Sequence, residues 1–182
     1  GAYAYHPPAD AGDGFPVADA AAAGVDPGAL GRVVQAVRRG EAGFLKSLLV
    51  ARGGSLILEE YFHGYGADDL SPIQSCTKSV SSLLVGAAIQ EGRIAGVDAE
   101  LLDFFPSERG AAGLGWQGLT LEHLLTMSMA LDWGADEAES LHGAGPSAFR
   151  TILARKVSGR PGADWAYVSM NVNLLAGVLR QA

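Results

Sequence analysis

The sequence predicts an α+β fold, in which a helix comes first, a β-hairpin follows, and helices fill the rest of the chain. Two β-prone runs, at residues 44–51 and 55–62, are separated only by Arg52, Gly53 and Gly54. Glycines between two such runs are typical of a hairpin. Later segments carry apolar residues at helical spacing, and strands that precede a run of helices favour the α+β class.

The first two predicted elements are an irregular leader and a helix. Prolines and glycines interrupt residues 1–25, which indicates irregular backbone. Asp26 and Pro27 then provide an N-cap and a first-turn proline. The helix that they begin should end at Gly40. The residues expected on its core face are Leu30, Val33, Val34 and Val37.

The two strands of the hairpin, residues 44–62, differ in their expected burial. The first is apolar on both faces around residues 48–50, which predicts an inner strand. The second contains Glu59 and Glu60 and is expected to be more exposed. A two-stranded hairpin is not stable alone, and no later stretch of the sequence predicts a further strand.

Residues 75–182 are predicted to be mostly helical. An acidic stretch at 132–145 interrupts them and predicts a loop. Apolar spacing, capping residues and stop signals predict helices at 75–92, 94–106, 120–127, 147–156 and 171–181.

Composition restricts the class of protein. The 182 residues are 48% hydrophobic and 18% charged, which is typical of one folded domain or part of one. The net charge of -7 and the pI near 5.0 argue against a nucleic-acid binder. No apolar run approaches the length of a membrane span. Cys76 is the only cysteine and the four histidines lack metal-ligand spacing, so neither a disulfide nor a metal site is predicted.

Ser75 and Lys78 are the first candidates for chemistry. Residue 75 begins a predicted helix, and residues three apart lie on one face of a helix, so the two side chains should be neighbours. A serine hydroxyl needs a nearby base before it can act as a nucleophile. A lysine amine that has lost its proton can be this base, and the N–H groups of the helix start would stabilise an oxyanion.

These residues also have plainer explanations. A helix start with a serine N-cap and a solvated lysine has the same spacing. His123 falls in an apolar helical pattern, where a packed histidine is the expected role. Cys76 follows Ser75 by one residue, which is about 100° around a helix, so we expect its thiol to point away from Ser75 into packing.

Several motifs in order resemble the serine β-lactamase and penicillin-binding-protein superfamily, with its class C-like serine hydrolases as the most similar branch. The resemblance covers the chain from about residue 13 to residue 182. The motifs are LLVARGG at 48–54, EYFHGY at 60–65, SCTKSV at 75–80, LLVG at 83–86, EGRI at 91–94, LEHLLTM at 121–127, LDW at 131–133, and Pro161-Gly162 followed by Tyr167 and Leu174-Leu175.

The resemblance implies roles for four residues. Ser75 matches the nucleophile, Lys78 the residue that takes or relays its proton, and Tyr167 the tyrosine that acts as base or acid. Without the resemblance, Tyr167 would be interpreted as an aromatic residue at the rim of a loop. Ser169 stands where the family motif Tyr-x-Asn has asparagine, as in esterase and amidase relatives, and is expected to bind substrate. Residues 128–130, Ser-Met-Ala, replace a usual Thr-Ser-Gly, which we interpret as a local packing change.

The implied fold is β-lactamase/transpeptidase-like, an antiparallel sheet flanked by helices with a helical lobe. Residues 1–182 would form a single incomplete domain that lacks the C-terminal strands. The missing strands carry a third motif and a second oxyanion donor in the family. We therefore expect the chain, if expressed alone, to be partly ordered, to aggregate and to show negligible turnover of substrate.

The implied activity is hydrolysis of a small ester or amide, with a β-lactam or D-amino-acid peptide among the candidates. It would pass through an acyl-enzyme on Ser75 and use no metal or organic cofactor. The sequence itself does not give the compartment, and only the family resemblance favours a periplasmic or secreted setting. A non-catalytic penicillin-sensing or scaffold domain and an inactive fragment are the alternatives. Neither the substrate nor the oligomeric state follows from the sequence.

Overall fold

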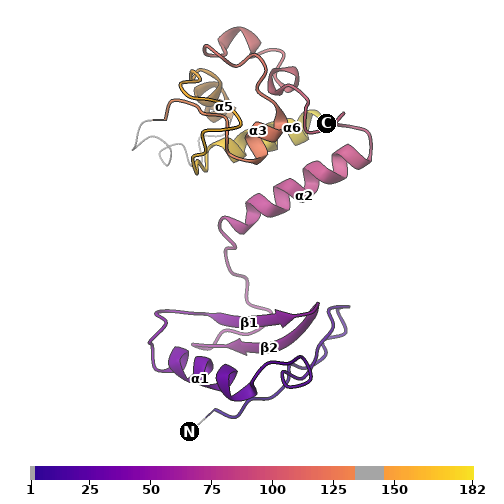
Figure 1. Cartoon of the computed structure of the whole chain (residues 1–182), viewed down its shortest axis with the longest axis vertical. Coiled ribbons are helices and arrows are strands. Elements are labelled where there is room, and N and C mark those ends of the chain that lie inside the picture. Colours follow the sequence, from indigo (N-terminus) through magenta and orange to yellow (C-terminus); the bar gives the residue numbers. More distant parts are fainter. Residues whose placement is uncertain (1–2, 134–145) are drawn as a thin grey trace. The chain divides into compact units, whose positions relative to one another are not determined.

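The computed structural model of the chain describes residues 3–133 and 146–182 and divides them between two compact units, Gly1–Pro72 and Ile73–Ala182 (Figure 1). A hairpin in the first unit and helices in both confirm the α+β class; that both units belong to one domain stays a prediction. The predicted loop at 132–145 lies outside the described residues from residue 134 onward. The elements are α1 (Pro27–Arg38), β1 (Ser47–Arg52), β2 (Ser55–Tyr61), α2 (Cys76–Gln90), the 3₁₀ turns η1 (Leu101–Phe104) and η2 (Arg109–Ala111), α3 (Leu121–Leu125), α5 (Pro146–Leu153) and α6 (Asn171–Gln181).

In the first unit, β1 and β2 form the predicted antiparallel hairpin. Arg52 pairs with Ser55, so only Gly53 and Gly54 lie in the connecting loop. Their φ angles are 58° and 83°. A two-residue loop with positive φ at both positions matches the twist of the strands that it joins.

The expectation that β1 is the inner strand is wrong, because β2 is the better buried of the two. Ile57 and Leu58 of β2 are fully buried, whereas Leu49 of β1 is 50% exposed. The leader accounts for this difference, since it runs along β2: Leu56 donates its N–H to Pro16 O and accepts one from Ala18.

Helix α1 begins as predicted, and its apolar face covers the hairpin. Gly28 N–H donates to Asp26 Oδ1 at 2.8 Å, which satisfies an otherwise free donor of the first turn. Leu30, Val34 and Val37 are buried in one cluster with β2. Val33, which was expected in this core, is 48% exposed because it lies about 100° around the helix from Val34.

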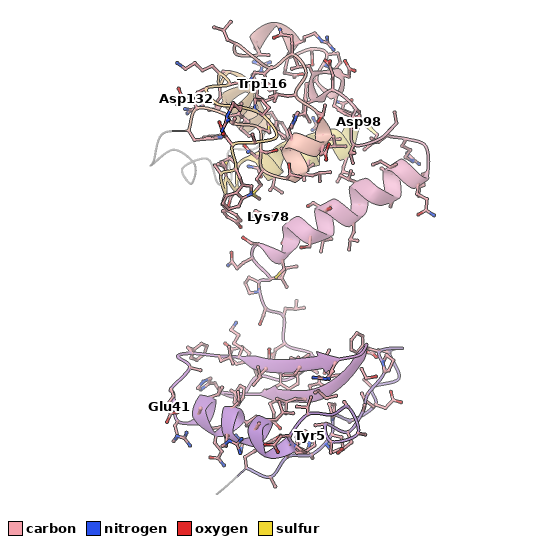
Figure 2. The ribbon with its side chains drawn as sticks, viewed as in Figure 1. Tyr5, Glu41, Lys78, Asp98, Trp116 and Asp132 are labelled. Atoms are coloured by element: carbon pink, nitrogen blue, oxygen red, sulfur yellow. The ribbon has the colours of Figure 1, made fainter. Side chains whose placement is uncertain are left out.

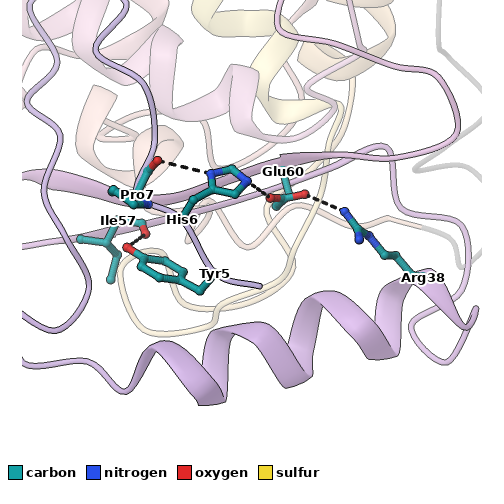
Figure 3. Close-up of polar contacts among 6 residues, drawn as sticks. All are labelled: Tyr5, His6, Pro7, Arg38, Ile57 and Glu60. Carbon is teal, nitrogen blue, oxygen red and sulfur yellow. Dashed lines mark hydrogen bonds and ion pairs between the residues drawn. The ribbon is translucent and has the colours of Figure 1, made fainter. Parts of the chain in front are cut away.

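A buried carboxylate joins the leader, α1 and β2 (Figure 3). Glu60, expected on an exposed strand, is only 7% exposed. Its two oxygens lie 3.3 Å from His6 Nε2 and 3.3 Å from Arg38 Nη2. Tyr5 OH donates to Ile57 O at 2.9 Å in the same region. His6 and Arg38 together offset the cost of removing the Glu60 carboxylate from water.

The second unit has its own apolar core, around the fully buried Trp116 (Figure 2). Trp116 donates its indole N–H to Arg155 O at 2.6 Å, so the one polar atom of the ring is satisfied. Other large side chains that are fully buried in this unit include Ile94, Leu101, Leu119, Leu121, Leu124, Met129, Ile152, Leu153, Met170 and Leu174.

The predicted helix at 94–106 is reduced to the single 3₁₀ turn η1. Glu100, directly before it, has extended backbone (φ -67°, ψ 133°) and forms a bridge with Thr120. This pairing prevents a helix from starting earlier. None of the helices in the described ranges combines the length and the apolar character that crossing a membrane requires.

Helix α2 agrees with its predicted boundaries but packs through one half only. It ends at the C-cap Glu91, before Gly92 with φ 72°. Val85 and Ala88 enter the core of the second unit, whereas Leu83 in the preceding turn is 74% exposed. The exposed half is the one that begins at Ser75.

Candidate active site

Ser75 occupies the position directly before α2, but it does not behave as a helix cap. Its hydroxyl makes no capping bond to the backbone of the helix. Ser75 Oγ instead accepts a hydrogen bond from Lys78 Nζ at 2.9 Å and another from Tyr167 OH at 2.7 Å. The three residues predicted to carry the chemistry therefore meet within the second unit. A serine N-cap beside a solvated lysine does not describe these contacts.

Lys78 reaches Ser75 because the two residues are one helical turn apart. Figure 2 labels Lys78 near the N-terminal end of α2. The side chain is half-buried, and its ammonium lies 5.1 Å from the centroid of the Tyr167 ring. A cation at this distance from an aromatic face is attracted to it, which holds the lysine between the serine and the tyrosine.

Tyr167 comes from a loop that lies 92 positions further along the chain than Ser75. Buried Val168 and Met170 anchor this loop at the start of α6. On its other side, Ala166 donates its N–H to Met127 O at 3.2 Å, which ties the loop to the turn after α3. The ring of Tyr167 is 52% exposed, so it projects from the core.

The pKa of Tyr167 lies below the usual value of 10.0. The hydrogen bond with Ser75 is the largest cause, and a hydrogen bond with Lys78 is the second. The positive charge of Lys78 and a hydrogen bond with Ser169 lower this pKa further. Each of these groups stabilises a phenolate, so the site favours a tyrosine that can take a proton.

Three of the described non-glycine residues of the second unit have positive φ. Gln74, directly before Ser75, has a φ of 47°, and Met127 and Ala130 in the turn after α3 have φ of 56° and 55°. Residues with a Cβ atom adopt this left-handed region only at an energetic cost. Strain of this kind gathers at functional sites, where the surrounding structure keeps it in place.

The start of α2 offers a backbone donor beside the serine hydroxyl. The N–H groups of Cys76, Thr77 and Lys78 donate to the carbonyls of Ile73, Gln74 and Ser75. Within the described ranges, the Ser75 N–H itself has no acceptor. A free N–H next to a nucleophile can bind the oxygen of a carbonyl under attack.

The second unit also contains a cavity of about 370 Å³, and Trp165 forms part of its wall. The Trp165 and Tyr167 ring centroids are 6.5 Å apart, so the indole is next to the tyrosine that contacts Ser75. Sequence reasoning missed this cavity; an aromatic residue two positions before Tyr167 was the one available signal. Its lining consists of Glu122, His123, Thr126, Ser128, Gly162, Ala163 and Trp165.

The structure corrects the expectation for Cys76. The thiol was expected to be packed, but Cys76 is exposed, because the first turns of α2 make few contacts within the second unit. His123 is half-buried and belongs to the cap of α3 with Thr120, which fits a packed histidine. No group of three potential metal ligands occurs among residues 3–133 and 146–182.

Comparison with protein families gives one match that covers most of the chain. A family model described as Beta-lactamase matches residues 17–182. The 6-aminohexanoate-dimer hydrolase of Paenarthrobacter ureafaciens is 31% identical over 90 residues, which are 50% of this chain and 22% of that protein.

Two solved structures have a similar fold. A Bacillus anthracis protein named as a 6-aminohexanoate-dimer hydrolase aligns with a TM-score of 0.64 and 16% identity, over 80% of this chain and 42% of its own. A Bacteroides dorei DSM 17855 protein named as a beta-lactamase aligns with a TM-score of 0.66 and 19% identity, over 86% and 46%. The chain thus spans less than half the length of the relatives that it matches.

Proposed function

Because the chain belongs to the Beta-lactamase family, we propose that it is the part of a serine hydrolase that carries the nucleophile, Ser75. The observation that supports this most directly is the convergence of Lys78 Nζ and Tyr167 OH on Ser75 Oγ. A serine becomes a nucleophile when a group beside it can take its proton, and both neighbours can exchange protons. We assign the chain to the class C-like branch as part of this proposal, because these three residues match the catalytic residues of that branch.

The proposed reaction forms and then hydrolyses an acyl-enzyme. Ser75 Oγ bonds to the carbonyl carbon of the substrate while its proton passes to the Lys78–Tyr167 pair. The pair returns that proton to the alcohol or amine that leaves. A water molecule then attacks the acyl group and gives a proton to the pair. That proton restores the Ser75 hydroxyl as the carboxylic acid departs, so the pair ends as it began.

Backbone and side-chain groups support separate parts of this reaction. The free N–H of Ser75 is placed to stabilise the oxyanion that develops on the substrate carbonyl. Ser169, whose hydroxyl contributes to the lowered pKa of Tyr167, is proposed to bind the substrate. No step requires a metal or an organic cofactor.

The proposed substrates are small esters and amides, including β-lactams and D-amino-acid peptides. One relative is named for hydrolysis of a 6-aminohexanoate dimer, which adds amides of ω-amino acids to this range. A periplasmic or secreted setting is proposed from the family resemblance alone.

Covalent labelling tests the assignment of Ser75. A fluorophosphonate or a penicillin should modify Ser75 in the full-length protein that contains these residues, and mass spectrometry of the digested protein locates the adduct. Ser75→Ala should abolish the label. Cys76→Ser is the matched control, since it changes the exposed neighbour of the nucleophile and should keep the label.

The site of the adduct and the rate of its release separate the possibilities. An adduct on Ser79, or one that Cys76→Ser removes, would mean that the nucleophile is misassigned. A stable adduct on Ser75 without turnover of any ester or amide would indicate a penicillin-sensing domain. Turnover of a neutral ester with loss of activity in Ser75→Ala supports the hydrolase.

A further inference from the structure

The cavity beside Trp165 contains a carboxylate that the proposed reaction does not use. Glu122 comes from α3, is exposed, and lines the cavity. Neither an ion pair nor a side-chain hydrogen bond joins its carboxylate to any other described residue. Its negative charge is therefore available to a ligand in the cavity.

The other charged groups of the neighbouring loop neutralise each other. Asp164 accepts hydrogen bonds from Arg160 Nη2 at 3.0 Å and from Arg160 N at 2.7 Å. The backbone and side-chain hydrogen bonds from Arg160 lower the pKa of Asp164, so the pair stays ionised. Within the part of the chain that the structure describes, Glu122 is thus a charge on the cavity wall without an opposite charge beside it.

Most of the remaining polar groups of the wall already have hydrogen-bond partners. Thr120 N–H donates to His123 Nδ1 at 3.1 Å, so Nδ1 is an acceptor and Nε2 carries the ring N–H. Thr126 Oγ1 donates to Glu122 O at 2.8 Å and lies 2.7 Å from Ser128 Oγ. A ligand would therefore meet one carboxylate, one imidazole N–H and the indole of Trp165, which is 65% exposed.

We propose that this cavity binds a primary ammonium group, which is the cationic end of the substrate that acylates Ser75. A carboxylate with a charge-assisted hydrogen bond and an indole face both attract an ammonium ion. Trp165 lies next to Tyr167, so a short methylene chain could pack on the indole and connect the ammonium group to the carbonyl at Ser75. The part of the inference that concerns the substrate rests on the proposed hydrolase function.

Binding of simple probes tests the cavity apart from catalysis. The probes are hexylammonium chloride and 1-hexanol, which have the same chain and differ in charge, titrated by calorimetry into the full-length protein. We expect hexylammonium to bind at least about fivefold more tightly than hexanol, as an ion pair with an aromatic face supplies. Glu122→Gln should remove this preference, and Trp165→Leu should weaken binding of both probes.

The matched control is the same Glu→Gln substitution at a position away from the cavity. Glu91→Gln removes an exposed carboxylate at the opposite end of α2 from Ser75, where it forms a surface ion pair with Arg93. It should bind hexylammonium like the unchanged protein. Equal binding of the two probes, or equal effects of Glu91→Gln and Glu122→Gln, would overturn the cavity assignment.

Competition with a neutral ester distinguishes the two proposals. Hexylammonium should inhibit hydrolysis of p-nitrophenyl acetate competitively, with an inhibition constant that Glu122→Gln raises. If the ester is hydrolysed without inhibition, the cationic subsite is wrong and the hydrolase stands. If hexylammonium binds through Glu122 but no ester is hydrolysed, the cavity is an ammonium site and the hydrolase proposal fails.

Discussion

The lowered pKa of Tyr167 predicts how the reaction depends on pH. If the phenolate of Tyr167 takes the Ser75 proton, acylation should rise with pH through an apparent pKa below the usual 10.0. Lys78→Ala removes the second largest cause of the lowering, so the rising limb should move to higher pH. The rate should also fall by about 10²–10⁴-fold, the usual contribution of a general acid–base group.

The pH–rate profile of kcat/KM for a neutral ester, in the full-length protein, measures this effect. Tyr167→Phe should lose the rising limb and most of the rate. If the unchanged protein and Lys78→Ala have identical profiles, Lys78 takes no part in the proton transfer. If Tyr167→Phe keeps nearly full activity, Tyr167 is not an acid or base but only an aromatic residue at the rim of its loop.

Ala130 is a residue in a conformation that suits glycine better. Its φ is 55°, and the β-lactamase-like family that the sequence resembles usually has glycine at this position. Ala130→Gly should raise the free energy of unfolding by about 0.5–1 kcal/mol, since the relief of strain exceeds the entropy that glycine adds to the unfolded chain. Chemical denaturation measures the change. Ala130→Val should have the opposite sign; stabilisation by both substitutions would contradict strain as the cause.

At the scale of helices and strands, two glycines within helices differ only in their surroundings. A Cβ atom at Gly86 of α2 would meet nothing within 4 Å, whereas one at Gly177 of α6 would lie 2.7 Å from the ring of Phe105. Gly86→Ala should therefore stabilise by about 0.5–1 kcal/mol through helix propensity. Gly177→Ala should destabilise by about 1–3 kcal/mol through overpacking. Thermal unfolding of both variants checks the pair. Stabilisation by Gly177→Ala would contradict overpacking against Phe105, and destabilisation by Gly86→Ala would contradict the helix-propensity argument.

The site itself depends on two elements and one turn. The start of α2 places Ser75 and Lys78 on one face, and the loop before α6 supplies Tyr167. The turn after α3 connects them indirectly, because Met127 O holds the backbone of that loop. Strain in this turn and at Gln74 is thus located where it can fix the geometry of the three residues.

At the scale of the whole molecule, the described residues form two apolar cores, and each lies within one unit. Leu70 is 97% exposed in the irregular segment between them, whereas Leu83, 74% exposed, is held in α2. Chymotrypsin at low concentration should therefore cut this 182-residue chain after Leu70 well before it cuts after Leu83. Mass spectrometry of timed samples follows both cuts, with Leu70→Asp as the control. Earlier cleavage at Leu83 would mean that α2 opens more readily than the segment at 70.

The sequence by itself determined the features that depend on local chemistry. Asp26-Pro27 predicted the start of α1, Gly53-Gly54 predicted the hairpin loop, and the three-residue spacing of Ser75 and Lys78 predicted their contact. Each is set within a few residues by backbone preference or helical geometry, so neighbouring residues carry the whole signal. Tyr167 could be included only through the resemblance to a family.

Tertiary structure alone decided which surfaces are covered and which distant residues meet. It buried β2 rather than β1, left Cys76 exposed, and reduced the segment at 94–106 to one turn. It also brought Tyr167 within 2.7 Å of Ser75 and formed the cavity at Trp165. Burial and these contacts depend on segments that lie far apart in the chain. Each segment is locally compatible with several partners, so the pairing leaves no periodic pattern in the sequence of either one.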